Sequence, residues 1–172
     1  MINPFKKTYS IKELNLFRSL SKVKPFEKLN YDEMATFLPH LHLRQYKNDE
    51  VVFFRNDPSN AFYIVKSGKV SLNIDVNNQF EVLMVQKSGG FFGQNAFLEM
   101  SKRMYTAIVI TEVSELYVLP KVNIMEIFDS RSLIRAKMMT SLSELYNEFN
   151  RNIFETYRSS LGFFNLSDAF KK

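Results

Sequence analysis

Four clusters of turn-forming residues divide the middle of the chain into short segments, and this division constrains the fold more than any other feature. The clusters lie at residues 56–60, 66–69, 75–78 and 87–90. Between them lie short apolar or alternating runs, of which Ala61–Val65 and Val70–Ile74 are the clearest. Strands at such spacing are typical of antiparallel sandwiches and barrels. The segment from Leu41 to Leu119 is therefore predicted to be antiparallel β structure, closed by Pro120.

Segments with helical spacing precede this β region. From Ser10 to Leu20, apolar residues recur three or four positions apart, which predicts a helix. A second helix start is marked by Asn30, an N-cap residue with Glu33 three positions on, close to a capping box. Pro39 is predicted to end this helix, because the residue before a proline disfavours helical backbone angles.

The last third of the chain is also predicted to be helical. A short helix is expected around residues 124–128 and, after a turn at 129–132, one apolar stripe runs from Ile134 to Tyr157. The stripe has two open interpretations, since it can pack on its own β region or pair with a partner. Leu161–Leu166 is apolar enough to dock somewhere. The residues assigned to a pairing seam are Met138, Leu142, Leu145 and Phe149.

Several kinds of chemistry are disfavoured by the residue types. The chain has no cysteine, which excludes disulfides, thiolate catalysis and zinc–cysteine sites. The two histidines, His40 and His42, have no carboxylate cluster beside them, so no metal site is expected. Neither histidine stands near a recognisable nucleophile turn, and no paired acid and base is evident. The chain is therefore predicted not to be an enzyme.

Charge and hydropathy bear on location and partners. No apolar run approaches the roughly 18–20 residues that span a bilayer, and the start has no apolar region typical of a secretion signal. A cytoplasmic location is expected. The net charge of +5 falls in residues 1–28, which hold seven basic and two acidic groups. This segment is either a contact for nucleic acid, acidic protein or anionic lipid, or a solvated helix and linker.

The stretch Ser88–Ala107 has the layout of an anion-binding cradle. Gly89 and Gly90 precede two phenylalanines, and Gly93 opens a short helix-like run, Gln94–Glu99. Glycine accepts the left-handed angles that let backbone N–H groups converge, and a helix start offers unpaired N–H groups. We therefore expect Gly93 to present amide hydrogens to a negatively charged ligand.

The order of these parts resembles that of the cyclic nucleotide-binding domain shared by catabolite-activator-type regulators, kinase regulatory subunits and gated channels. The resemblance covers about Phe26–Tyr146 and implies a mainly β fold, an antiparallel eight-stranded jelly roll with N-terminal and C-terminal helices. Five matched pieces carry it: PFEKLNYDEM, the run Asp49–Val52, the acidic turn at Asp57, FYIVKSGKVSLNI with its glycine Gly68, and SGGFFGQNAF.

This resemblance also implies a division of the chain and a mode of assembly. The expected parts are a basic N-terminal helix and linker (1–25), a jelly-roll domain (26–128) and a C-terminal helical segment (129–172). In DNA-binding members a long helix pairs two subunits and leads into a winged helix-turn-helix. The few residues after Tyr157 leave no room for such a reader. We expect a homodimer or partner protein at the C-terminal helix, and no direct DNA binding.

The ligand-contacting positions depart from the family pattern. The glutamate that accepts hydrogen bonds from the ribose is replaced by Gln94. Aligning Thr106 and Ala107 with the family's small-residue pair puts Tyr105 where an arginine grips the cyclic phosphate. A phenol cannot form the two-pronged, charge-assisted contact that arginine gives. Since a hydrogen bond to a charged group contributes roughly 1.5–3 kcal/mol, losing one weakens binding about 10- to 150-fold.

Arg103 offers an alternative phosphate ligand. It lies two residues before Tyr105, and on a strand that step keeps a side chain on the same face. In a third interpretation, Lys102 and Arg103 belong to a solvated loop. Gly68, Gly89 and Gly90 are expected to serve turns. The candidate ligand contacts are Gly93, Gln94, Asn95, Ala96, Arg103, Tyr105 and Thr106.

Two functions are compatible with the sequence. The first is a regulatory module that weakly binds cyclic AMP, cyclic GMP or another anionic ligand, without a metal, and signals through its C-terminal helices. The second is a degenerate member that binds no ligand and serves as a dimerisation or protein-interaction scaffold. A third and weaker possibility is a transcription regulator that lacks its own reader.

Overall fold

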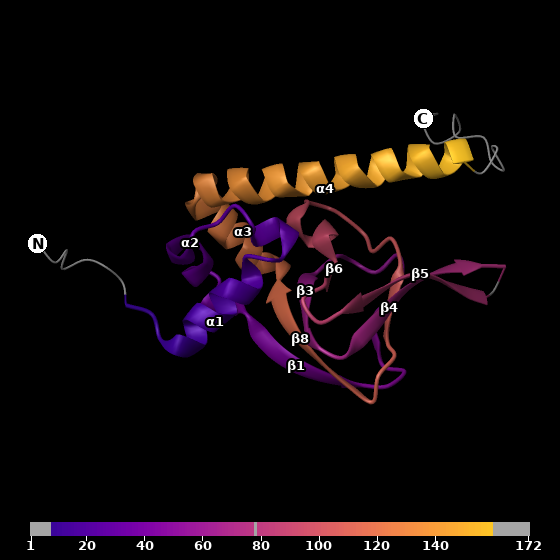
Figure 1. The fold of residues 1–172 in the computed structure, drawn as a ribbon, viewed down its shortest axis with the longest axis horizontal. Coiled ribbons are helices and arrows are strands. Elements are labelled where there is room, and N and C mark those ends of the chain that lie inside the picture. Colours follow the sequence, from indigo (N-terminus) through magenta and orange to yellow (C-terminus); the bar gives the residue numbers. More distant parts are fainter. Residues whose placement is uncertain (1–7, 78, 160–172) are drawn as a thin grey trace, which may run out of the picture.

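Two four-stranded antiparallel sheets form the body of the chain, in a computed structural model that describes residues 8–77 and 79–159. The described part holds eight strands, and the sheets face each other as a jelly roll flanked by helices (Figure 1). The predicted fold class is confirmed. The first sheet has the order β1 (His42–Lys47), β8 (Val113–Pro120), β3 (Ala61–Ser67), β6 (Phe91–Phe92), and the second β2 (Val51–Phe53), β7 (Thr106–Val109), β4 (Lys69–Val76), β5 (Gln79–Lys87).

The hairpin between β3 and β4 turns at Gly68, where the sequence places a turn cluster. Gly68 has φ +83°, and an added Cβ would lie 2.8 Å from the Cα of Ser114 and 2.8 Å from Oγ1 of Thr111. Gly68 is therefore needed for its left-handed backbone and for the close approach of β8. Gly89 also has a positive φ of +84°, but a Cβ there would meet nothing within 4 Å.

Short helical elements precede the sheets. Asn30 caps α2 as predicted, because Glu33 N donates to Asn30 Oδ1 (2.9 Å) and Asn30 N donates to Glu33 Oε2 (2.8 Å). The predicted helix end at Pro39 is wrong. The α-helix already ends at Ala35, and the backbone continues with 3-10 hydrogen bonds between residues three positions apart. The elements are α1 (Ile11–Leu20), η1 (Lys24–Phe26), α2 (Tyr31–Ala35) and η2 (Leu38–His40).

Two hydrophobic clusters stabilise the fold, one inside the roll and one between the first sheet and the helices. Side chains alternate along β3, so Phe62 and Ile64 face the helices while Tyr63 and Val65 face the roll interior. All three predicted segments of the chain contribute to the cluster beneath the helices. Its members with at most 2% of the side chain exposed include Phe17, Leu20, Phe26, Phe37, Ile124, Phe128, Ile134 and Met138.

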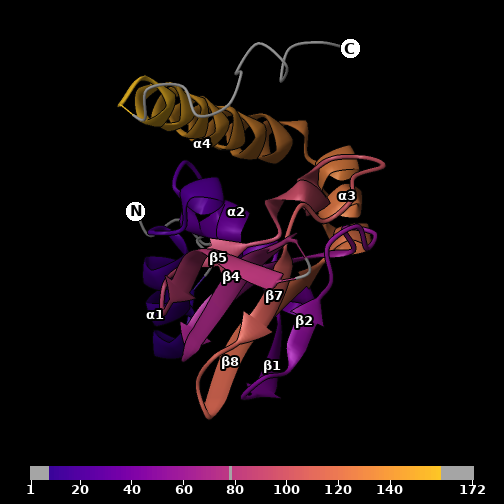
Figure 2. The ribbon, with the colours of Figure 1, turned by 90° about the vertical axis from the view of Figure 1, so that its right-hand side faces the viewer.

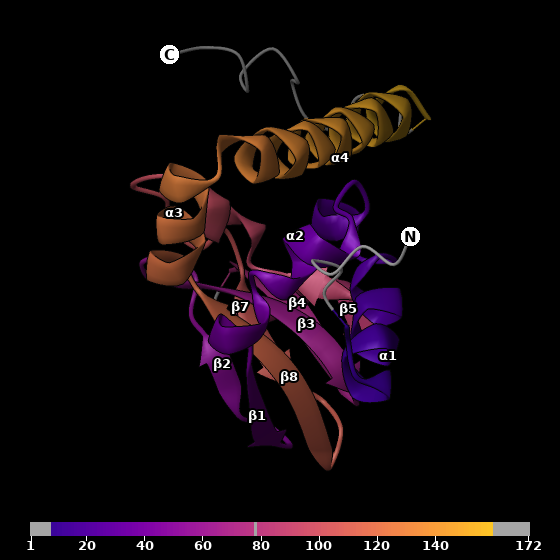
Figure 3. The same ribbon diagram turned by 90° about the vertical axis from the view of Figure 1, so that its left-hand side faces the viewer.

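The long helix α4 (Ser132–Ser159) follows α3 (Lys121–Ser130) after a break at Arg131, close to the predicted turn. Figures 1 and 3 show α4 starting beside α2 and α3 and continuing past the sheets. Its first half is anchored by buried apolar side chains and by an ion pair from Lys137 to Glu33 of α2 (2.7 Å). After Leu145, no described residue of α4 is buried.

The predicted pairing seam is largely wrong. Met138, Leu142 and Leu145 are exposed by only 0%, 1% and 8%, because they pack in the cluster beneath the helices of their own chain. These side chains are therefore not available to a partner. Phe149 is the exception, with 36% of its surface exposed.

Some predicted features lie outside the described residues. These are the apolar segment Leu161–Leu166 and the basic residues Lys6 and Lys7. Among the residues described, no helix is both long enough and apolar enough to cross a bilayer.

Candidate ligand-binding site

The glycine-rich segment forms a tight turn between β6 and a short 3-10 helix, η3 (Gln94–Phe97). Gly93 is the N-cap of η3 and has φ +76°. A Cβ at this position would lie 2.7 Å from Nη1 of Arg103 and 3.0 Å from the carbonyl oxygen of Ala61. Both the backbone angle and the packing therefore require glycine here.

Arg103 is buried behind Gly93, with 3% of its surface exposed. Its Nη1 donates to Ser59 Oγ (2.9 Å) and to the Gly93 carbonyl (3.3 Å), and its Nη2 donates to the Ala61 carbonyl (2.8 Å). The guanidinium lies 4.0 Å from the ring centroid of Phe53. The interpretation of Arg103 as part of a solvated loop is therefore wrong.

Within the described part of the chain, the carboxylate of Asp57 attracts the charge of Arg103 but forms no ion pair with it. None of the ion pairs among the described residues involves it, and its Nε is a buried donor without a partner. Burial lowers the pKa of the Arg103 guanidinium, which remains charged because arginine does not lose its proton in proteins. Carbonyl dipoles, a hydroxyl and ring faces compensate the charge. Arg103 thereby holds the backbone of Gly93 against β3.

Tyr105 accepts the hydrogen bond that Gly93 was expected to offer to a ligand. The Gly93 N–H donates to Tyr105 Oη at 3.0 Å. Burial raises the pKa of Tyr105 to about 12, although the hydrogen bond from Gly93 opposes this shift. Arg103 and Tyr105 precede β7, which begins at Thr106. The same-face argument for a strand does not apply to them directly. Their side chains nevertheless lie at the same place, because both form a hydrogen bond with the backbone of Gly93 and both pack against the ring of Phe53.

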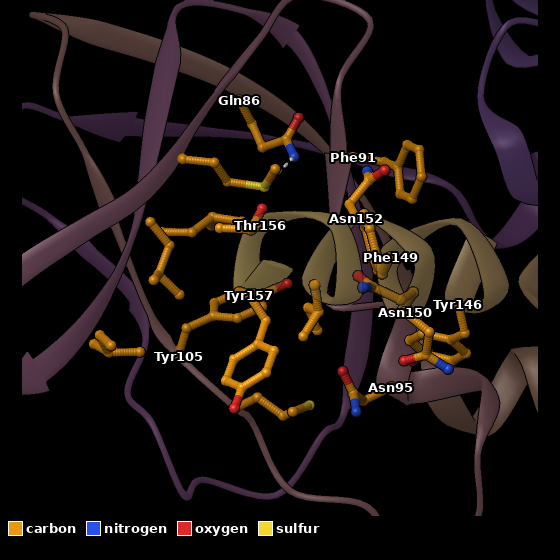
Figure 4. Close-up of a pocket in the computed structure, with 17 residues that line it drawn as sticks. Gln86, Phe91, Asn95, Tyr105, Tyr146, Phe149, Asn150, Asn152, Thr156 and Tyr157 are labelled. Atoms are coloured by element: carbon orange, nitrogen blue, oxygen red, sulfur yellow. Dashed lines mark hydrogen bonds between the residues drawn. The ribbon is translucent and has the colours of Figure 1, made fainter. Parts of the chain in front are cut away.

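A cavity of about 750 Å³ lies between η3, the β4–β5 hairpin and α4 (Figure 4). This volume is within the roughly 300–1,000 Å³ usual for small-molecule sites. Among the described residues, no side chain that lines the cavity is charged. The lining consists of Leu72, Ile74, Leu83, Met84, Gln86, Phe91, Gln94, Asn95, Met104, Tyr105, Tyr146, Phe149, Asn150, Asn152, Ile153, Thr156 and Tyr157.

Three of the predicted ligand contacts, Gln94, Asn95 and Tyr105, line this cavity together. The structure does not bring the others to it. Ala96 is fully buried in the core beneath the helices, and Thr106 is buried with its Oγ1 accepting from the backbone N–H of Arg55 (3.0 Å). Arg103 and Gly93 stand behind the cavity wall.

The second half of α4 is the wall that sequence reasoning missed. Tyr146, Asn150, Asn152, Thr156 and Tyr157 all line the cavity and come from this one helix (Figure 4). The sequence feature that could have indicated these lining residues is the set of polar residues within the apolar stripe. That signal does not say which element the helix covers, because the placement of α4 depends on the tertiary packing of its first half.

No group of three or more histidine or acidic side chains that could hold a metal ion occurs within residues 8–77 and 79–159. His40 ends η2 and His42 begins β1. The chemistry available at the candidate site is therefore binding through apolar contacts and neutral hydrogen-bonding groups.

Comparison with known proteins agrees with this geometry. The sequence model of the cyclic nucleotide-binding domain matches residues 43–131, which is more than half of the chain. The chain belongs to the cyclic nucleotide-binding domain family, a family of regulatory binding domains.

Individual relatives are distant. A protein of Rhodopseudomonas palustris, whose name assigns it to potassium channels, is 28% identical over 92 residues, which is 54% of this chain and 22% of that protein. The catabolite activator protein of Thermus thermophilus has a TM-score of 0.66 at 22% identity, covering 77% of this chain and 62% of that one. The regulatory domain of Toxoplasma gondii PKA, co-crystallised with cAMP, has a TM-score of 0.63 at 19% identity, covering 72% and 46%. The chain thus spans less than two thirds of each relative.

Proposed function

We propose that this chain is a ligand-sensing regulatory module in which the occupant of the cavity sets the position of the second half of α4. One observation carries the proposal. The first half of α4 is anchored in the core, whereas none of its described residues after Leu145 is buried and several of them line the cavity. A ligand there would contact η3 on one side and α4 on the other. It would stabilise any state in which the two approach each other.

Cyclic AMP and cyclic GMP are the first ligands to test, because the family match and the Toxoplasma complex support them. We expect this binding to be weak. The described part of the lining provides no cation for the phosphate. The guanidinium of Arg103 donates to Ser59 and Ala61, and the Gly93 N–H donates to Tyr105. An unpaired charge in an uncharged site is costly.

Calorimetric titration of the chain with cyclic AMP and cyclic GMP tests this expectation. We expect dissociation constants on the order of 1 mM, which corresponds to about −4 kcal/mol. A variant carrying Gln94→Glu and Tyr105→Arg should bind at least about tenfold more tightly, because it restores a ribose acceptor and a cation. Micromolar binding by the unaltered chain would contradict the proposed lack of a phosphate ligand. Absence of heat for both chains would favour the scaffold function.

A protein contact is the second candidate function, and an exposed apolar strand favours it. β5 is an edge strand of its sheet, and Figure 2 shows β4 and β5 below α4. Phe80 is 57% exposed and Val82 is 56% exposed, and Ile153 on α4 is 50% exposed. Exposed apolar groups on an unpaired edge are typical of interaction surfaces. We propose that a second copy of the chain covers β5 and the second half of α4.

Sedimentation equilibrium of a charged variant tests this dimer. The double variant Phe80→Glu and Val82→Glu should sediment as a monomer, because the two carboxylates would be buried unpaired in the interface. Val122→Glu is the control, since Val122 is 62% exposed on α3, away from β5. A native chain that sediments as a monomer, or a double variant that keeps the native mass, would rule out this interface.

A further inference from the structure

We propose that the cavity beneath α4 takes an uncharged, largely apolar molecule that carries one or two hydrogen-bonding groups, rather than an anion. This inference rests on the proposed function, because it names the class of ligand for the same site. It explains a cavity of about 750 Å³ to which residues 8–77 and 79–159 contribute no charged side chain.

The apolar character of the walls comes from several elements at once. Leu72 belongs to β4, Leu83 and Met84 to β5, Phe91 to β6, and Ile153 to α4. A ligand surrounded on these sides gains stability from the apolar area that it buries, roughly 25 cal/mol per Å². A ligand charge placed among them would lose its hydration without a counterion.

The polar groups of the lining are neutral as well. They are carboxamides, tyrosine hydroxyls and one threonine hydroxyl, with Asn95 on η3 and Asn150 on α4 both present (Figure 4). Such groups donate to or accept from alcohols, amides and similar neutral groups. The guanidinium of Arg103 donates to Ser59, Ala61 and Gly93 behind the wall.

Gln94 is the side chain that indicates a hydrogen-bonding group in the ligand. Only 9% of its surface is exposed, and it lines the cavity. Its carboxamide forms no hydrogen bond with any residue in the described part of the chain. A carboxamide offers two donors and one acceptor, and leaving it unpaired under a bound ligand is costly. A ligand hydroxyl or amide that pairs with Gln94 removes this cost.

Two dyes with the same ring system separate neutral from anionic ligands. Phenylnaphthylamine is uncharged and has one N–H donor, and anilinonaphthalene sulfonate adds a single sulfonate. The chain has no tryptophan, and its tyrosines do not absorb at the longer wavelengths that excite these dyes, so dye fluorescence can be followed without protein background. We expect phenylnaphthylamine to bind at least about tenfold more tightly than the sulfonate, and more tightly than cyclic AMP in a competition titration.

Three variants connect this preference to the cavity. Met104 lines the cavity and is 66% exposed, whereas Met100 in the same loop is fully exposed and does not line it. Met104→Arg should reduce or reverse the preference for the neutral dye, because it adds a cation to the lining. Met100→Arg is the matched control and should leave it unchanged. Gln94→Met, which keeps the side-chain length, should weaken the binding of the neutral dye a few-fold.

Each result is decisive. Tighter binding of the sulfonate or of cyclic AMP by the native chain would overturn the neutral ligand class and leave the sensing function intact. Equal effects of Met104→Arg and Met100→Arg would overturn it as well, because the dye would then bind elsewhere. Failure of all three compounds to bind would overturn both the ligand class and the sensing function.

Discussion

Replacement of Arg103 by alanine is expected to lower the free energy of unfolding by about 3 kcal/mol, although Arg103 forms no ion pair with any described residue. The substitution leaves the carbonyls of Ala61 and Gly93 and the hydroxyl of Ser59 without their donor. It also removes the group that packs 4.0 Å from the ring centroid of Phe53. Relief of the buried charge offsets part of this loss.

Arg55→Ala is the matched control. Arg55 pairs with Asp75 at 2.6 Å, but its side chain is 38% exposed, and exposed ion pairs contribute at most about 1 kcal/mol. Urea unfolding of both variants measures the difference. A larger loss in Arg55→Ala than in Arg103→Ala would show that Arg103 does not organise the turn at Gly93.

Replacement of Gly68 by alanine is expected to cost about 4 kcal/mol of stability. A left-handed residue with a Cβ costs roughly 1–2 kcal/mol, and an added methyl group in a packed site costs roughly 1–3 kcal/mol. The Cβ would lie 2.8 Å from the backbone Cα of Ser114, which cannot move away without disturbing β8.

Gly89→Ala separates these two causes. Gly89 has φ +84°, close to the +83° of Gly68, but a Cβ there meets nothing within 4 Å. It should therefore cost only about 1–2 kcal/mol, the backbone contribution. Thermal unfolding of the two variants compares them directly. Equal losses would mean that the approach of Ser114 is not what restricts position 68.

Local patterns predicted the elements that depend on local interactions. The capping box at Asn30 and Glu33 and the hairpin turn at Gly68 both appear where the sequence indicates them. Each depends on backbone angles or hydrogen bonds within a few residues. The resemblance to a known family added the arrangement of eight strands as a jelly roll, which no local pattern determines.

Predictions about long-range contacts were less successful. Whether Arg103 faces solvent, ligand or core depends on two backbone hydrogen bonds to the turn at residues 56–57. The N–H of Asn56 donates to the carbonyl of Arg103, and the N–H of Arg103 donates to the carbonyl of Asp57, each at 2.9 Å. Nothing in residues 88–107 reveals these contacts. The arginine therefore looked like a loop residue.

The apolar stripe of α4 illustrates the same limit. The spacing of its apolar residues identified the helix, but the two halves of the stripe contact different parts of the protein. Met138 and Leu142 close the core of their own chain, while Phe149 and Ile153 line the cavity and remain partly exposed. A period of 3.6 residues shows which side chains share a face and not what covers that face.

Amide hydrogen exchange tests most directly whether a ligand in the cavity acts on α4. Exchange is measured without ligand, with millimolar cyclic AMP, and with saturating phenylnaphthylamine, and α1 serves as the reference because none of its residues lines the cavity. We predict that a bound ligand slows exchange both in η3 and in α4 after Leu145, while α1 is unchanged. Protection confined to η3 while the ligand is bound would contradict a sensing role for α4.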